Sequence, residues 1–348
     1  QVKKNYIFFA IKGNKFDGEK FIFEAVKNGA IAVVCSKVCK YKNKKITIIK
    51  SSDVRSLLSK VCSKFYSLKP KNIIAVTGTN GKTSVSDLFY QILNNNNIRV
   101  ASIGTLGVKY DNKISKTTLT SPDTIDLHKI LEKLKKLKIE NVIIEASSHG
   151  LHQKRINDLN LKAGIFTNFS QDHLDYHKTM KSYLNSKLIL FKEILSKNKA
   201  IITDNSLREF SILKKISKKR NLKLIDINKI TKKIQNSKLK ELSNFQQKNL
   251  SMAILAAKIC KIKEQKIFKS LNKIKDVNGR LELIRKFPNN VKIYVDFAHT
   301  PDALQKIADT LKVNHGKNIS IVFGCGGNRD FKKRPIMAKI ASSNFKKI

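Results

Sequence analysis

The pattern of hydrophobic and polar positions opens with a small unit of strands and helix. Within residues 1–69, strand-like apolar runs and one helix-like stretch follow one another: YIFFAI, EKFIFEAVKNG (the helix), AIAVVCS and KITIIK. Short runs rich in β-branched and aromatic residues around an amphipathic stretch predict an α/β unit. Pro70 and Lys71 then break the pattern, and we expect the first domain to end there.

From residue 73 the pattern changes to strand, loop and helix in repeated order. Four short apolar runs mark the expected strands: IIAVTG (73–78), NVIIEAS (141–147), AGIFTNF (163–169) and AIITD (200–204). Short strands that are apolar throughout and alternate with helices are typical of a largely parallel, doubly wound sheet with both faces covered. We therefore expect a central α/β domain over residues 70–280.

A third unit is expected over residues 281–348. Its strands are predicted at VKIYVDFA (291–298) and NISIVFG (318–324), with the helix PDALQKIADTLK (301–312) between them and one more helix before Ile348. The chain starts at Gln1 rather than Met, and the third unit is short. We therefore expect a fragment that is open at both ends.

Charge and cysteine content narrow the classes of function. The 348 residues carry 70 Lys and Arg against 26 Asp and Glu, a formal net charge of +44. The lysines are dispersed rather than gathered in one arm, which indicates solvated faces more than a nucleic-acid site, although the field would attract an anionic nucleotide. Five cysteines without a CxxC pair argue against a disulfide framework or structural zinc and favour reduced cytosolic thiols. No apolar run approaches the ~18 residues of a membrane span.

The strand at 73–78 leads into a glycine-bracketed turn, whose residues are Gly78, Thr79, Asn80, Gly81, Lys82, Thr83 and Ser84. The glycines are closer together than in the full P-loop pattern. The physics is the same, because a loop between a buried strand and a helix points backbone N–H groups at an anion. Lys82 can reach the β- and γ-phosphates, and Thr83 or Ser84 can offer a hydroxyl to Mg²⁺. The alternative is a glycine turn with a surface lysine, but the strand–loop–helix context favours a nucleoside triphosphate.

Three further residues have two readings each. Glu145 ends a predicted strand, where ligands of open α/β sheets bind, so it is either a Mg²⁺ ligand or an acid at a helix N-terminus. His173, in the loop TNFSQDHLDYH, either binds a metal or is simply solvated. Lys187 lies in the helix-like YLNSKLILF, and spacing alone favours a lysine that extends from the helix edge into water. The cationic glycine loop FGCGGNRDFKKRP suits a carboxylate or a phosphate.

Taken in order, ten stretches between residues 78 and 337 resemble the Mur ligase family: GTNGKTS, GTLG, LTSPDTIDL, EASSHGLHQKR, FTNFSQDHLDYH, YLNSKLILF, FQQKNLSMAILAA, NGRLE, VDFAHTPDAL and GCGGNRDFKKRPIM. SSHGL, DHLDYH and DFAHTPDAL are more specific than the glycine loop. The resemblance implies a UDP-binding domain at 1–69, an ATP-binding domain at 70–280 and an incomplete Rossmann-like domain at 281–348.

The resemblance also implies an activity. ATP phosphorylates the terminal carboxylate of a UDP-MurNAc-peptide, and the amino group of an incoming amino acid then displaces phosphate. For the best-matching branch, the acceptor is UDP-MurNAc-L-Ala-D-Glu, in peptidoglycan biosynthesis. The amino acid is meso-diaminopimelate or L-lysine, and we expect the former. A cytoplasmic monomer without a specific nucleic-acid partner is expected.

Roles follow from the resemblance residue by residue. Lys82 would hold the γ-phosphate, and Thr83 would lie near a first Mg²⁺. Glu145 would bind Mg²⁺ and His173 a second Mg²⁺. Lys187 matches the lysine that the family carbamylates into an anionic metal ligand, which replaces its helix-edge reading. Nucleotide contacts are implied for Asn249, Arg280 and Asp296, and substrate contacts for Thr120, Ser121, Ser147, Gln153, Arg155 and Arg329. Ser121 and Asn328 depart from the family's usual threonine and aspartate.

Alternatives stay open. They are another Mur-type ligase or folylpolyglutamate synthase, a basic nucleic-acid-binding ATPase, and a nucleotide-binding module without catalysis. Intact Lys82, Glu145, His173 and Lys187 argue against the last. A uracil-site motif is expected before Gln1 and a DNPR-type specificity motif after Ile348, so the choice between diaminopimelate and lysine lies outside this sequence.

Overall fold

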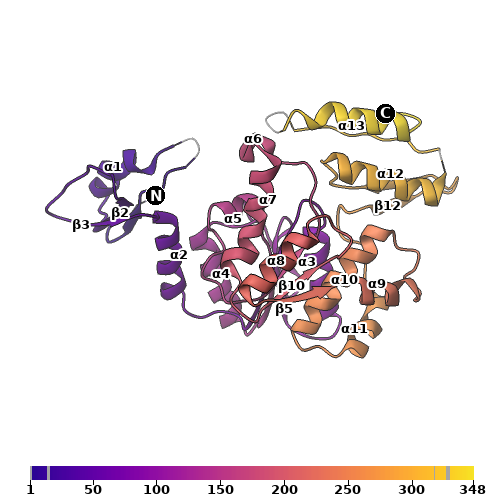
Figure 1. Cartoon of the computed structure of the whole chain (residues 1–348), viewed down its shortest axis with the longest axis horizontal. Coiled ribbons are helices and arrows are strands. Elements are labelled where there is room, and N and C mark those ends of the chain that lie inside the picture. Colours follow the sequence, from indigo (N-terminus) through magenta and orange to yellow (C-terminus); the bar gives the residue numbers. More distant parts are fainter. Residues whose placement is uncertain (1, 14–15, 317, 327–329) are drawn as a thin grey trace.

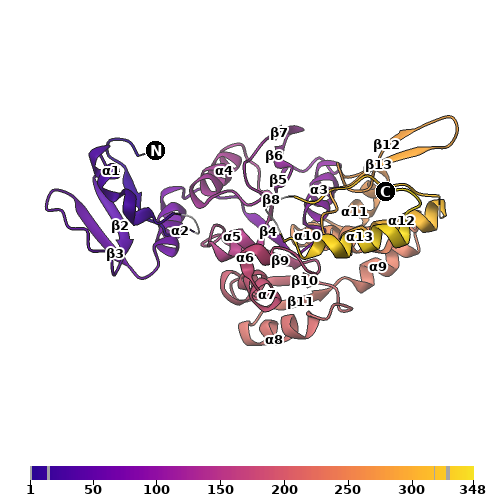
Figure 2. The same cartoon turned by 90° about the horizontal axis from the view of Figure 1, so that it is seen from above.

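The computed structural model describes residues 2–13, 16–316, 318–326 and 330–348. Figures 1 and 2 show an elongated molecule with the N-terminal unit (indigo) at one end and a large sheet with its helices in the middle. The last two helices, α12 and α13 (yellow), lie beside the far part of the central unit in both views.

The N-terminal unit is a three-stranded parallel sheet in the order β1-β2-β3. Its elements are β1 (Ile7–Phe9), η1 (Gly18–Phe21), α1 (Ile22–Lys27), β2 (Ala32–Ser36), β3 (Thr47–Ser51) and α2 (Val54–Phe65). A small core forms around Ile22, Val33 and Cys35. Asp53 caps α2 by accepting the backbone N–H of Ser56 at 2.9 Å and also bonds Lys154 of the central unit. The predicted α/β pattern is therefore present in this unit.

The central unit holds an eight-stranded sheet in the order β11-β10-β9-β4-β8-β5-β6-β7. Its strands are β4 (Asn72–Thr77), β5 (Val100–Gly104), β6 (Gly107–Tyr110), β7 (Lys113–Ser115), β8 (Asn141–Glu145), β9 (Leu161–Phe166), β10 (Ala200–Thr203) and β11 (Lys223–Asp226). Pairing is parallel from β11 to β5 and antiparallel through β6 and β7. The predicted, mostly parallel sheet is confirmed. The parallel strands β5 and β11 and the antiparallel edge of β6 and β7 lay outside the predicted strands.

Helices cover both faces of this sheet, as a doubly wound fold requires. They are α3 (Lys82–Asn94), α4 (Thr124–Lys136), α5 (Ser148–His152), α6 (Leu174–His177), α7 (Met180–Ile189), the π-turn η2 (Leu190–Ile194), α8 (Phe210–Arg220), α9 (Asn228–Gln235), α10 (Asn244–Ile259), α11 (Glu264–Ser270) and η3 (Leu271–Lys273). Ile74 and Val76 of β4 face α3 and α10, whereas Ile73 and Ala75 face the side of α4 and α7. Because side chains alternate between the two faces along a strand, β4 contributes residues to both hydrophobic cores.

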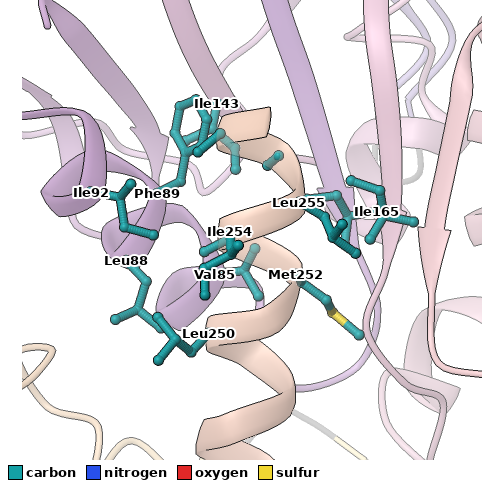
Figure 3. Packing of buried hydrophobic residues seen from close by; sticks show 14 of the residues in the cluster. Val85, Leu88, Phe89, Ile92, Ile143, Ile165, Leu250, Met252, Ile254 and Leu255 are labelled. Carbon is teal, nitrogen blue, oxygen red and sulfur yellow. The ribbon is translucent and has the colours of Figure 1, made fainter. Parts of the chain in front are cut away.

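Figure 3 shows the first of these cores, where α3 packs on α10. The labelled side chains are Val85, Leu88, Phe89 and Ile92 of α3, Leu250, Met252, Ile254 and Leu255 of α10, Ile143 of β8 and Ile165 of β9. Each fully buried apolar side chain of this size contributes roughly 1.5–3 kcal/mol. This packing fixes the start of α3, and with it the glycine loop, against the sheet.

Beyond the central unit lie a hairpin and two helices: β12 (Glu282–Lys286), β13 (Lys292–Val295), α12 (Pro301–His315) and α13 (Lys333–Asn344). The two predicted helices are present, but the predicted strand at 318–324 is wrong. Its described residues form only an isolated bridge, Ser320 to Lys347. Ile321 and Phe323 pack toward α12 and α13 while Val322 is exposed, so the side chains alternate as in a strand without a neighbouring strand to pair with. In the part of the chain described here, no helix is long and apolar enough to cross a membrane.

His128 of α4 gives the fold a pH dependence. Its side chain is fully buried, and burial, helped by the charge of Lys69, lowers its pKa to about 4. The unfolded chain binds this proton near pH 6.5, so the contribution of His128 to stability is complete above pH 6.5 and falls as the pH approaches 4. We expect the free energy of unfolding of a His128→Leu variant, measured with urea, to rise by about 2–3 kcal/mol relative to that of the unmodified protein when the pH falls from 7.5 to 4.5. Parallel pH profiles for the two proteins would contradict this.

Candidate active site

A cavity of about 690 Å³ lies where the central strands end at their carboxyl side. The glycine loop after β4, Thr105 after β5, Glu145 of β8 and His173 after β9 line it, and the C-terminal unit closes one side with residues of α12. It gathers most of the residues expected from the sequence: Thr79, Asn80, Gly81, Lys82, Thr83, Ser84, Thr120, Ser121, Glu145, Ser147, Arg155, His173, Lys187, Asn249, Arg280 and Asp296. Gly78 contributes through its carbonyl, Gln153 lies at another cavity, and Arg329 and Asn328 lie outside the described residues.

The glycine loop is shaped by residues that follow β9. Asn168 accepts the backbone N–H of Asn80 through its side chain at 2.9 Å and that of Thr79 through its carbonyl at 3.0 Å. The Thr167 hydroxyl donates to the carbonyl of Asn80 at 2.6 Å. Gly81 then caps α3 with a left-handed φ of 86°. The loop is therefore preformed at a helix N-terminus, the arrangement that binds phosphate.

Gly81 leaves no room for a side chain. A Cβ here would lie 2.6 Å from the side-chain oxygen of Asn249, in a left-handed conformation that also disfavours other residues. We expect Gly81→Ala to weaken AMPPNP binding by about tenfold or more while the protein stays folded, as measured by calorimetry. Gly316→Ala is the matched control, because Gly316 also has a positive φ, 69°, but a Cβ there meets nothing within 4 Å. Equal affinities for the two variants would contradict the prediction.

Two lysines converge on one carbonyl oxygen. Lys187 Nζ donates to Gly78 O at 2.7 Å, and Lys82 Nζ donates to the same oxygen at 3.0 Å and to Thr79 O at 2.8 Å. Lys187 is only 1% exposed, so the reading of a lysine that extends into water is wrong. Burial and the charge of Lys82 lower the pKa of Lys187 well below its usual value. A neutral amine here is a nucleophile, whereas an ammonium is not.

Glu145 is buried at the end of β8 and is held by three donors. It accepts the backbone N–H and the hydroxyl of Thr105, both at 3.0 Å, and the hydroxyl of Thr83 at 3.1 Å. Arg280 in turn donates to the Thr83 hydroxyl at 3.0 Å. Burial raises the pKa of Glu145, and the nearby Lys82 opposes that rise. This carboxylate is set into the cavity wall rather than exposed at a helix start.

His173 occupies a strained position beside a second carboxylate. It caps α6 with a φ of 55°, and its Nε2 lies 3.3 Å from Asp172 Oδ2. Its ring packs edge-on against His149 at 4.8 Å and Tyr183 at 5.9 Å between centroids. Burial lowers its pKa to about 3, so the imidazole is neutral near pH 7, the form that binds metals.

The donor set fits a magnesium–nucleotide complex better than a metal ion held by protein alone. Among the described residues, no three His, Cys, Asp or Glu side chains are grouped so as to hold a metal. Glu145 and His173 line the same cavity as the phosphate-binding loop. Mg²⁺ typically takes one or two carboxylates and completes its shell with water and substrate phosphates.

Hydroxyls and a guanidinium form the other end of the cavity. Ser121 donates to Glu145 O at 2.8 Å, its Oγ lies 3.0 Å from Ser147 Oγ, and Arg155 donates to Ser121 O at 2.9 Å. The Thr120 and Thr105 hydroxyls lie 3.3 Å apart. These groups can bind carbonyl and carboxylate oxygens of a peptide placed beside the metal-binding side chains.

A second cavity of about 520 Å³ lies between the N-terminal and central units. Its walls are largely aromatic, from Phe8, Phe9, Phe16 and Phe21, with Arg55 and Gln153 as polar members. Gln153 also accepts from Arg155 Nη2 at 2.6 Å, so the two cavities are linked through this pair. An aromatic wall with a cation suits a planar ring that carries phosphates.

The C-terminal unit reaches the nucleotide loop directly. Asn80 donates to Asp302 Oδ2 at 3.0 Å and to the Thr300 hydroxyl at 3.2 Å. Asp296 accepts the backbone N–H of Leu281 at 2.6 Å and faces the cavity. The guanidinium of Arg280 lies over the ring of Phe297 at 5.1 Å. Residues predicted from three separate motifs thus meet at this boundary.

Comparisons with known proteins now decide the family. The model of the Mur ligase middle domain matches residues 76–272, that of the Mur ligase glutamate ligase domain matches 279–348, and that of the Mur ligase family catalytic domain matches 1–66. The chain belongs to the Mur ligase family. Members of this family are ATP-dependent ligases that form C–N bonds, so the predicted enzyme class is confirmed.

Similar proteins give the same picture. UDP-N-acetylmuramoyl-L-alanyl-D-glutamate–2,6-diaminopimelate ligase of Rickettsia bellii is 39% identical, over 98% of this chain and 76% of the relative. The enzyme of that name from Aquifex aeolicus is also 39% identical, over 98% of this chain and 73% of the relative. A solved structure of such a ligase has a TM-score of 0.74 at 27% identity and covers 99% of this chain and 75% of its own.

More distant solved structures share the fold alone. MurF of Thermotoga maritima in complex with ADP has a TM-score of 0.59 at 17% identity, covering 98% of this chain and 79% of its own. Folylpolyglutamate synthase/dihydrofolate synthase of Yersinia pestis, complexed with AMPPNP and Mn, has a TM-score of 0.66 at 16% identity, covering 83% of this chain and 77% of its own. The three-part Mur ligase fold predicted from the sequence is confirmed by these likenesses.

Sequence analysis left several residues of this Mur ligase site without a role. Thr105 holds Glu145, Asn168 shapes the glycine loop, and Asp172 contacts His173. Each of them lies within a few residues of a strand end, and side chains at carboxyl strand ends face the site of an open sheet. That signal could have found them.

Proposed function

We propose that this Mur ligase uses ATP to join meso-2,6-diaminopimelate to UDP-N-acetylmuramoyl-L-alanyl-D-glutamate. The observation that carries the proposal is the convergence of Lys82, Lys187, Glu145 and His173 on one cavity whose other end offers the hydroxyls and guanidinium of the Ser121 and Arg155 group. The relatives that are 39% identical bear the name of this reaction. L-Lysine is the second amino acid to be tested.

The proposal gives each unit a task. Residues 1–69 would receive the UDP end in the aromatic cavity, 70–280 would bind ATP, and 281–348 would bring the amino acid. The peptide end of the acceptor would then lie along Thr120, Ser121, Ser147 and Arg155, with Gln153 between the two cavities. Arg329, outside the described residues, keeps its predicted contact with the carboxylate of the amino acid. ATP and UDP-linked sugars are made in the cytoplasm, so we propose that location for the enzyme.

The first step joins two anions, so charge neutralisation dominates its barrier. An acceptor carboxylate oxygen attacks the γ-phosphorus of ATP, and the bond from that phosphorus to the bridging oxygen breaks. ADP departs, and the acceptor becomes an acyl phosphate. Backbone N–H groups at the start of α3 and the ammonium of Lys82 hold the phosphates in line. Asn249, Arg280 and Asp296 line the same cavity and would bind the rest of the nucleotide.

Thr83, Glu145, His173 and a carbamylated Lys187 would hold Mg²⁺, which when bound neutralises phosphate charge in both steps. Lys187 becomes a ligand when its neutral amine attacks CO₂ and releases one proton, because the carbamate offers anionic oxygens where an ammonium would repel a cation. The low pKa of Lys187 and its contact with Gly78 O support this modification.

The second step forms the amide. The amine of diaminopimelate attacks the acyl carbon, the C–O bond to phosphate breaks, and the phosphate leaves with that electron pair while a proton goes to solvent. Residues of α12 close one side of the cavity and would limit access of water to the acyl phosphate.

The test is phosphate release from Mg-ATP by the purified protein with UDP-MurNAc-L-Ala-D-Glu and one amino acid at a time. We expect release only with the acceptor and meso-diaminopimelate together. D-glutamate, L-alanine and L-lysine serve as comparison amino acids. Release that depends on L-lysine would change the proposed substrate, and release stimulated by RNA or DNA instead would overturn the proposal.

A further inference from the structure

Asp172 joins the loop that carries His173 to the C-terminal unit. Its Oδ2 lies 3.3 Å from Nε2 of His173 and 3.3 Å from Nε2 of His299, and its Oδ1 accepts from Nζ of Lys333 at 3.0 Å. His173 belongs to the central unit, whereas His299 precedes α12 and Lys333 begins α13. One carboxylate therefore contacts a proposed metal ligand and, from another unit, an imidazole and a lysine.

The contact between Asp172 and Lys333 is buried on both sides, at 3% and 4% exposure of the side chains. A second polar contact runs beside it, because Gln171 donates to the buried Asp330 at 3.2 Å. Two buried charges are costly to remove from water unless each is well paired. This pair therefore exists only when residues 330–333 lie on the loop at 171–172.

The contacts set the orientation of the Asp172 carboxylate. His299 Nε2 lies at hydrogen-bond distance, 3.3 Å, from Oδ2, and Lys333 Nζ donates to Oδ1 at 3.0 Å. A carboxylate beside one nitrogen of a metal-binding imidazole restrains the orientation of the ring.

We propose that Asp172 is a positioning residue that orients His173 for the metal–nucleotide complex, and that Lys333 makes this orientation depend on docking of the C-terminal unit. The proposal rests on the proposed function for the role of His173. Docking of α13 then supports the phosphoryl-transfer end of the site, so the two halves of the reaction are coupled through one buried carboxylate.

The experiment measures binding of Mn²⁺ to the protein with saturating AMPPNP, by electron paramagnetic resonance of free Mn²⁺. We expect Asp172→Asn and Lys333→Met each to weaken Mn²⁺ binding about 10- to 100-fold, the range found when a partner of a ligating histidine is lost. Affinity for AMPPNP without metal should stay unchanged. The double variant should bind Mn²⁺ no more weakly than Asp172→Asn, because Lys333 acts through Asp172.

The matched control is Lys332→Met, which removes the same charge from the adjacent, exposed position. Lys333→Arg, which keeps the cation, should restore most of the affinity and the turnover of Lys333→Met, whereas a purely structural role would not require a charge. If Lys333→Met does not fold, the His299→Ala variant tests the proposal instead, because the half-exposed His299 can be replaced with less risk to folding. We expect this variant to lose Mn²⁺ affinity several-fold.

The two levels of the proposal fail separately. An unmodified protein that does not bind Mn²⁺ with AMPPNP would overturn the proposed function itself. An unmodified protein that binds, together with Lys333→Met and His299→Ala variants that bind equally well, would overturn only the role of Asp172. Strictly additive losses in the double variant would also overturn it, because they would show that the two residues act independently.

Discussion

Lys187→Ala abolishes ligation, with kcat expected to fall about a thousandfold or more, because the variant would lack the proposed carbamate that holds Mg²⁺ against the phosphate charge. Lys187 is buried beside Gly78 and Lys82, where no water-exposed lysine can substitute for it. Added bicarbonate should not rescue this variant, since the carbamate needs the amine that the substitution removes. Phosphate release with acceptor and diaminopimelate is the measurement.

The control for this prediction is Lys181→Ala, an exposed lysine on the same helix. It should keep full activity. Carbon-13 NMR of the unmodified protein in labelled bicarbonate should show a carbamate signal that is absent from Lys187→Ala and present in Lys181→Ala. Full activity of Lys187→Ala would refute the carbamate assignment.

The second large effect is expected for Glu145→Gln, which keeps the size of the side chain and removes its charge. We expect kcat to fall about a hundred- to a thousandfold, and higher Mg²⁺ concentrations to restore part of it. The new amide group would also face the Thr105 N–H, which now donates to the carboxylate. Turnover as a function of Mg²⁺ concentration measures both effects.

Glu140→Gln is the matched control for that substitution. Glu140 stands just before β8, pairs with Lys135 and bonds the backbone N–H of Lys71, far from the cavity at the other end of the strand. Its variant should keep the activity and the Mg²⁺ dependence of the unmodified protein. If Glu145→Gln did the same, Glu145 would have no part in metal binding.

The sequence predicted four strands of the central sheet because these strands are mostly apolar, whereas the buried β5 carries Ser102 and Gly104. The predicted strands are buried on both faces, so each shows as a run of four to six mostly apolar residues. They are β4, β8, β9 and β10. β7 is short and exposed, and β12 is exposed along most of its length, so both lack that signal. The wrong strand at 318–324 has the alternation of a strand, but pairing depends on a neighbour that local pattern does not encode.

The residues of the candidate site were likewise predicted only in part. A motif predicted the glycine loop, because its function requires particular residues at particular spacings. Lys187 was misread from spacing alone, since its helix packs the lysine inward, between the sheet and the glycine loop. Asp172 lies within a recognised motif, but its proposed role depends on contacts with Lys333 and His299. Both residues follow it by more than one hundred positions. Only the fold brings them together.

The shape of the glycine loop has a consequence for synthesis of the protein on the ribosome. Residues 78–81 are held by Thr167 and Asn168, and β4 lies between β8 and β9, which emerge later. Backbone contacts between distant segments form only after both are available. The nascent chain therefore exposes Lys82 and its loop without a nucleotide-binding shape until about ninety further residues have been made. Competence to bind ATP is then a late event in translation, although the motif itself is translated early.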